Sequence, residues 1–64
     1  MNALRILTVD DEPLALRRLK LLLQAMPGVD HVGEAGSCRE ALAKISSLTP
    51  DVVLLDIRMR AGTA

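Results

Sequence analysis

The chain has 64 residues, of which half are apolar although none is Phe, Tyr or Trp, and its eight basic side chains balance eight acidic ones. This length allows one small domain at most, and the balanced charge predicts neither nucleic acid nor an anionic membrane as a partner. No apolar run approaches the ~20 residues of a membrane span, and charged residues interrupt any signal-peptide core. The single cysteine, Cys38, suits a reducing compartment, so we expect a soluble, cytoplasmic chain.

The first predicted strand covers residues 3–9, and Asp10-Asp11-Glu12-Pro13 then begins a helix. Asp11 or Glu12 is expected to cap this helix, with Pro13 in its first turn. Apolar residues recur at helical spacing from Leu14 to Met26, and Pro27-Gly28 ends the helix. The predicted buried face comprises Ala15, Leu16, Leu19, Leu22, Leu23 and Met26, while Leu14 and Leu21 share a flank that needs another cover or stays exposed.

Residues 29–35 predict a second, more polar strand at a sheet edge, followed by a turn at Gly36. Ser37 and Glu40 fit a capping box, with Ser37 as the N-cap of a second helix. Thr49-Pro50 stops this helix, and residues 52–55 form a short apolar run typical of a parallel strand. The second helix presents an apolar face of Ala41, Leu42, Ile45 and Leu48. The pattern is β-α-β-α-β, with right-handed crossovers.

Acidic side chains follow two of these strands, Asp10-Asp11 after the first and Asp56 after the third. The carboxyl ends of parallel strands meet at the crevice where open α/β sheets bind ligands. Two unit charges ~4 Å apart repel by about 4 kcal/mol at an effective dielectric of ~20. A hard divalent cation such as Mg²⁺ turns this repulsion into binding, so the pattern predicts a Mg²⁺ site.

Two segments resemble a response-regulator receiver domain, of the CheY-like, flavodoxin-like fold. They are Ile6-Leu7-Thr8-Val9-Asp10-Asp11-Glu12-Pro13 with the following Leu-Ala-Leu-Arg-Arg-Leu, and Pro50-Asp51-Val52-Val53-Leu54-Leu55-Asp56-Ile57-Arg58-Met59. The pattern is similar to receivers that precede LytTR-type DNA-binding domains. The resemblance covers residues 3–59 and implies two-component signal transduction.

The resemblance implies a role for each matching position. Asp56 matches the aspartate that accepts a phosphoryl group from a sensor histidine kinase, and Asp11 matches a direct Mg²⁺ ligand. Asp10 matches a neighbour that acts through water, and Arg58 matches the position whose backbone carbonyl completes the metal site. No nucleophile–base pair or phosphate loop indicates an independent enzyme.

The chain ends before the fourth and fifth strands that the resemblance implies, and Arg60 stands where receivers have a proline. We therefore expect a truncated receiver domain at residues 1–59 and an irregular tail at 60–64. The expected fold is the β-α-β-α-β half of a CheY-like domain, with three parallel strands in the order 2-1-3. The hydroxyl residue and the lysine that transmit switching have no matching position, so switching is expected to be lost.

In this half-domain residues 52–55 would form a hydrophobic sheet edge with unpaired backbone groups. The simplest remedy is a two-fold homodimer that pairs the third strands antiparallel into a six-stranded sheet, and exchange of segments between chains is the runner-up. The alternative function is therefore a self-associating half-domain, natural or engineered, without phosphotransfer.

Several residues also have a simpler interpretation. Asp10 and Asp11 could only cap the first helix, and Asp56 could be a turn residue or an inherited but inactive phosphoacceptor. The remaining polar candidates are expected to have no function: His31 as a solvated strand residue, Cys38 as a packing residue and Arg17-Arg18-Lys20 as a solvated helix face.

Overall fold

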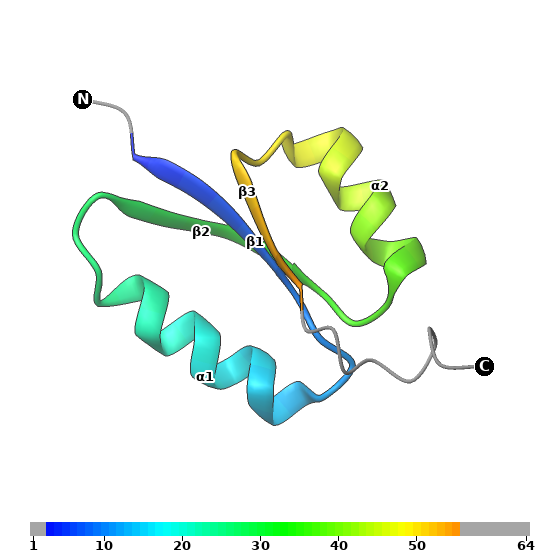
Figure 1. The fold of residues 1–64 in the computed structure, drawn as a ribbon, viewed down its shortest axis with the longest axis horizontal. Coiled ribbons are helices and arrows are strands. Elements are labelled where there is room, and N and C mark those ends of the chain that lie inside the picture. Colours follow the sequence, from blue (N-terminus) through cyan, green and yellow to red (C-terminus); the bar gives the residue numbers. More distant parts are fainter. Residues whose placement is uncertain (1–2, 56–64) are drawn as a thin grey trace.

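The computed structural model describes residues 3–55, and the expected tail at 60–64 lies outside this range. The elements are β1 (Leu4–Val9), α1 (Pro13–Gln24), β2 (Val29–Ala35), α2 (Cys38–Leu48) and β3 (Val52–Leu55). All pairings are parallel, and the strand order is β2-β1-β3. The predicted β-α-β-α-β pattern and 2-1-3 order are therefore confirmed. Figure 1 shows α1 and α2 on opposite sides of the sheet.

The core is built on β1, the strand with a neighbour on each side. Its last four residues, from Ile6 to Val9, are at most 5% exposed. Leu7 and Val9 pack with Ala35, Ala41 and the half-buried Leu48 on the α2 side. Because side chains alternate along a strand, Ile6 and Thr8 lie on the opposite face, toward α1. This burial on both faces explains the nearly continuous apolar sequence of β1.

The buried face of α1 is narrower than its sequence predicts. Leu16 and Leu23 are buried, but Leu22 is 64% exposed and Met26 is 50% exposed, so their predicted burial is wrong. At 100° per residue Leu22 lies about 120° from Leu16, toward the side where no described element covers the helix. Leu14 and Leu21 are also exposed, which agrees with the flank expected from the sequence.

The predicted apolar face of α2 is also buried only in part. Ala41 is buried and Leu48 is half-buried against the core, as predicted. Leu42 is 69% exposed and Ile45 is 37% exposed, so the predicted apolar face of α2 is only partly used. Among the described residues α2 contacts β2 and β1 but not β3, and this leaves one side of the helix without a partner.

A glycine beside an irregularity in the β1–β2 pairing leaves room for a side chain of α2. Ile6 pairs with His31 but Leu7 pairs with Gly33, so Val32 is an extra residue in β2. A Cβ atom on Gly33 would lie 2.9 Å from Leu48 Cδ1 and 3.4 Å from Leu7 Cδ1. Gly33 therefore leaves the space that Leu48 fills above β1.

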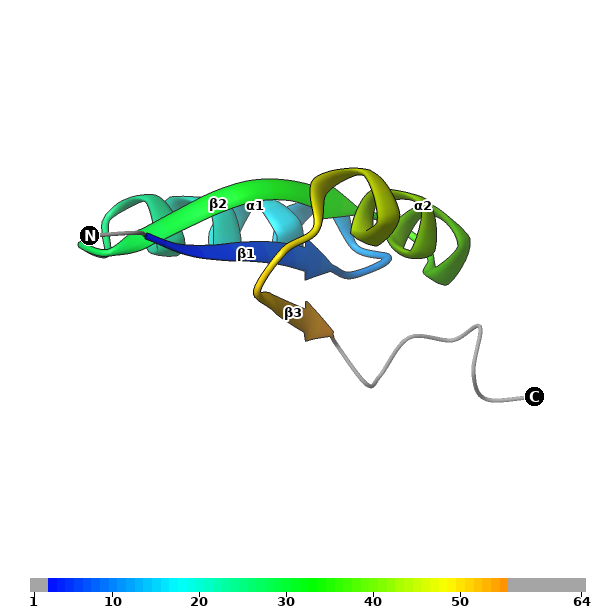
Figure 2. The same cartoon turned by 90° about the horizontal axis from the view of Figure 1, so that it is seen from above.

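Neither described helix contacts β3. The strand is therefore held by its backbone pairing with β1 and by polar contacts at its first residues. Figure 2 shows β3 apart from both helices, at the side of β1 opposite β2. At the start of the strand, Asp51 Oδ2 accepts from the Arg5 backbone N–H at 2.9 Å, and the Asp51 N–H donates to the Arg5 carbonyl at 2.8 Å. The Arg5 guanidinium also donates to the Thr49 carbonyl at 2.9 Å.

Neither helix within residues 3–55 is long and apolar enough to cross a membrane.

Replacing Asp51 with Ala should destabilise the fold by about 1 kcal/mol, because the Arg5 backbone N–H loses its side-chain acceptor. Urea unfolding measures the change. Asp30→Ala is the matched control, since Asp30 is an exposed strand carboxylate with no side-chain hydrogen bond among the described residues. Equal effects of the two substitutions would contradict a specific role for Asp51.

Candidate functional site

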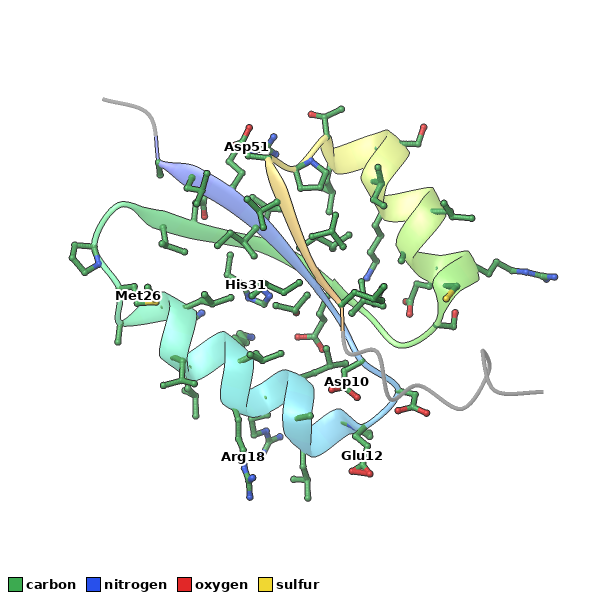
Figure 3. The ribbon with its side chains drawn as sticks, in the orientation of Figure 1. Asp10, Glu12, Arg18, Met26, His31 and Asp51 are labelled. Carbon is green, nitrogen blue, oxygen red and sulfur yellow. The ribbon has the colours of Figure 1, made fainter. Side chains whose placement is uncertain are left out.

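Asp10 is the buried acidic side chain at the carboxyl end of the sheet. It follows β1 directly and is 3% exposed. Its Oδ1 accepts a hydrogen bond from the Glu12 backbone N–H at 2.9 Å, and its own N–H donates to the Ala35 carbonyl at 3.0 Å. Figure 3 shows Asp10 beside the start of α1, with Asp51 at the opposite end of the sheet.

The predicted cap of α1 is therefore wrong in its detail. Glu12 occupies the N-cap position, but its side chain makes no capping hydrogen bond, and Asp11 is exposed. Asp10 instead accepts from the N–H of Glu12, two residues further along the chain, in an Asx turn at the helix start. One of the two carboxylate oxygens of Asp10 thus supports the start of the first helix, as the simpler interpretation of this residue expects.

The second oxygen of Asp10, Oδ2, is the candidate ligand atom of this residue. Among the described residues no donor bonds Oδ2, although Oδ1 is occupied. Asp10 and Asp11 both line a polar hollow of about 500 Å³ between α1 and α2. Carboxylate oxygens are the donors that Mg²⁺ prefers, so these two residues fit a Mg²⁺ ion. The other residues lining the hollow are Pro13, Leu16, Arg17, Lys20, Glu34, Gly36, Glu40 and Lys44.

The remaining predicted ligands, Asp56 and Arg58, lie outside the described residues. Within residues 3–55 no group of three or more acidic, His or Cys side chains could hold a metal ion. The last described pair in the β1–β3 ladder is Val9 with Leu55, and each of these residues directly precedes one of the predicted acids in sequence. The strands that lead to Asp10 and Asp56 therefore end side by side.

The carboxyl end of β2 is joined to α2 by a network that the capping box predicts only in part. Ser37 Oγ accepts from the Glu40 N–H at 3.1 Å, as expected for an N-cap. Glu40 Oε1 accepts from the Gly36 N–H at 2.6 Å, one residue before the N-cap. Lys44 Nζ lies 3.5 Å from Glu40 Oε2 and donates to the Glu34 carbonyl. The hydrogen bond from Gly36, and then the charge of Lys44, hold the pKa of Glu40 below its usual value.

The sequence interpretation also missed a polar pair inside the sheet. His31 was expected to be solvated, but it is half-buried, and its Nε2 lies 2.9 Å from the hydroxyl of the fully buried Thr8. The two residues come from neighbouring strands, at the point where the β1–β2 register changes. Because the register sets which residues face each other, no local pattern around His31 could reveal the contact. Cys38 is exposed, so its expected role in packing is wrong.

The family model for the response regulator receiver domain matches residues 6–63. The chain belongs to this family. The match extends from the apolar part of β1 past both acidic segments, and it confirms the resemblance drawn from them. It places the chain with the response regulators of two-component systems, whose receiver domains bind Mg²⁺ at the phosphorylation site and interact with histidine kinases.

Several curated proteins are similar to this receiver. The transcriptional regulatory protein BtsR of Salmonella typhi is 45% identical over 56 residues, which cover 88% of this chain and 23% of BtsR. The DNA-binding transcriptional activator DevR/DosR of Mycobacterium tuberculosis is 45% identical over 58 residues, 91% of this chain and 27% of the relative.

A protein-glutamate methylesterase/protein-glutamine glutaminase of Agrobacterium fabrum is 50% identical over 60 residues, 92% of this chain and 17% of the relative. The receiver thus spans about a quarter or less of the length of these relatives. No solved structure matches the chain.

The lowered pKa of Glu40 predicts a dependence of stability on pH. Since its pKa is lower in the folded state, ionised Glu40 stabilises the fold fully above its unfolded pKa of about 4.3, and this contribution is lost as the pH falls through the folded pKa. The free energy of unfolding of the parent should therefore fall more steeply below about pH 5 than that of Glu40→Gln. Urea unfolding across this pH range measures both, with Asp30→Asn as the control; parallel curves for parent and Glu40→Gln would refute the prediction.

Proposed function

We propose that this receiver is the phosphoacceptor of a two-component system, with Asp56 as the residue that a sensor histidine kinase phosphorylates. The observation that carries the proposal is the register of β1 and β3, in which Val9 faces Leu55. Asp10 and Asp56 directly follow this pair in sequence. Because the two strands are parallel, their carboxyl ends lie next to each other at one edge of the sheet.

In this proposal Asp10, Asp11 and Asp56, with the backbone carbonyl of Arg58, hold Mg²⁺. The ion offsets negative charge on the carboxylates and on the incoming phosphoryl group. An oxygen of Asp56 attacks the phosphorus atom in line with the donor's leaving group, which departs with its bonding electrons, and an acyl phosphate forms. Glu12 contributes through its backbone N–H, which fixes one oxygen of Asp10 and leaves the other available.

The proposed activity is that of a phosphate-accepting module without an enzyme reaction on another substrate. The Agrobacterium fabrum relative is named for an esterase activity, but the match covers only 17% of that protein. Likewise DevR/DosR is named for DNA binding, but the match covers only 27% of that protein. We therefore propose a histidine kinase as the partner, and no nucleic acid for the 64 residues themselves.

Phosphorylation of Asp56 can be tested directly with a small phosphoryl donor such as acetyl phosphate and Mg²⁺. We expect intact-protein mass spectrometry to find one added phosphoryl group, lost in Asp56→Asn and strongly reduced in Asp11→Asn, because metal ligands stabilise the charge in the transition state. Asp51→Asn, at the opposite end of the sheet, is the matched control. Equal labelling of the parent and Asp56→Asn would refute the assignment.

A second function, self-association into a homodimer through β3, is favoured by the exposure of this strand. Within residues 3–55 its only strand partner is β1, and neither helix contacts it. Its apolar residues Val53, Leu54 and Leu55 are 38%, 37% and 53% exposed. An uncovered apolar edge strand is a template for pairing with another chain. We propose antiparallel pairing of two β3 strands about a two-fold axis.

Light scattering across a concentration series measures this association. We expect a dimer whose mass falls toward that of the monomer in Leu54→Lys, because a lysine on an edge strand opposes pairing. Leu42→Lys is the matched control, since Leu42 lies on α2 and is more exposed than Leu54. A monomeric parent at all concentrations would exclude the homodimer without affecting the phosphoacceptor proposal.

A further inference from the structure

Two side chains of α2 hold the end of β2, and we call Glu40 and Lys44 the α2 clamp. Lys44 Nζ donates to the carbonyl of Glu34, the second-to-last residue of β2. Glu40 Oε1 accepts from the N–H of Gly36, the first residue after the strand, at 2.6 Å. The two clamp residues are themselves paired, with Lys44 Nζ 3.5 Å from Glu40 Oε2. The clamp thus fixes the backbone on both sides of one residue.

That residue is Ala35, whose carbonyl accepts the hydrogen bond from the Asp10 N–H at 3.0 Å. Ala35 is 1% exposed and packs in the core, so it has little room to move while the clamp is closed. The position of the Asp10 backbone therefore depends on the peptide that the α2 clamp holds. The Glu12 N–H then sets the direction of the Asp10 side chain.

Capping of α2 does not by itself account for the Glu40 carboxylate. The hydroxyl of Ser37 already accepts from the Glu40 N–H at 3.1 Å and so caps the helix. The carboxylate of Glu40 bonds outside the helix, to Gly36. Glu40 and Lys44 also line the same polar hollow as Asp10 and Asp11.

We propose that Glu40 is a positioning residue for the Mg²⁺ site, acting through Gly36 and Ala35 on the backbone of Asp10. The inference rests on the proposed binding of Mg²⁺ by Asp10 and Asp11. Glu40 does not touch the ion; it keeps the free oxygen of Asp10 where the ion needs it. Residues that orient metal ligands typically change metal affinity by about 10–100-fold when they are replaced.

The experiment compares Mg²⁺ titrations of the 64-residue chain followed by amide chemical shifts. We expect Glu40→Ala to weaken Mg²⁺ binding about tenfold, the lower end of the range for residues that orient ligands. Glu40→Gln keeps an oxygen that can accept from the Gly36 N–H, so it should restore affinity to within about twofold of the parent. The matched control is Asp51→Ala, which removes a side-chain hydrogen bond to a β1 backbone amide at the other end of the sheet.

A second measurement does not need the metal. Hydrogen exchange of the Asp10 amide without Mg²⁺ should be faster in Glu40→Ala than in the parent, and unchanged in Asp51→Ala after correction for global stability. If Glu40→Ala does not fold, Lys44→Met opens the other half of the clamp and should produce the same two changes more weakly.

The outcomes separate the two proposals. Parent-like Mg²⁺ affinity and Asp10 exchange in a folded Glu40→Ala variant would overturn the positioning role of Glu40. Failure of the parent to bind Mg²⁺ would overturn the proposed metal site. Amide exchange at Asp10 would then decide alone whether Glu40 holds this residue.

Discussion

The parallel pairing of β1 with a strand on each side is the constraint on which the rest of the structure depends. Val9 faces Ala35 on one side and Leu55 on the other, so three strand ends lie at one edge of the sheet. Both faces of β1 are covered in its second half, and this requires the apolar run that precedes Asp10. The same register that builds the core therefore brings the acidic residues after β1 to the edge that holds the candidate site.

The elements themselves could be predicted because their signals are local. Apolar runs marked β1 and β3, and Thr49-Pro50 marked the end of α2. Ser37 as the N-cap and Glu40 at the third helical position also follow from a short pattern, and the structure confirms both. Signals of this kind depend on residues within one turn of each other, so a single sequence contains them completely.

Contacts between distant segments could not be predicted in the same way. Periodicity showed that Leu22 and Met26 share a face with Leu16, but it did not show how much of that face the sheet covers. The hydrogen bond from the Asp10 N–H to the Ala35 carbonyl depends on the pairing of β1 with β2, which no pattern around residue 10 records. Lys44 reaches the Glu34 carbonyl only after α2 has docked, so its role was invisible in the sequence.

The two proposed functions use different parts of one small sheet. Phosphate acceptance depends on the carboxyl ends of the strands, whereas association depends on the outer edge of β3. These surfaces meet where Asp10, Leu54 and Leu55 line a second hollow beside α1. A copy bound along β3 would therefore lie next to a residue of the proposed metal site, so binding of the ion and association would influence each other.

The attachment of β3 also has a kinetic consequence. Contacts within β1-α1-β2 join residues such as Thr8 and His31, 23 positions apart, whereas the Arg5–Asp51 bond joins residues 46 positions apart. Doubling the length of a closed loop costs only about 0.6 kcal/mol, but within residues 3–55 neither helix contacts β3 to offset that cost. During folding β3 should dock last, and during partial unfolding it should leave first. The segment that leads to Asp56 then detaches while Asp10 stays bound to β2.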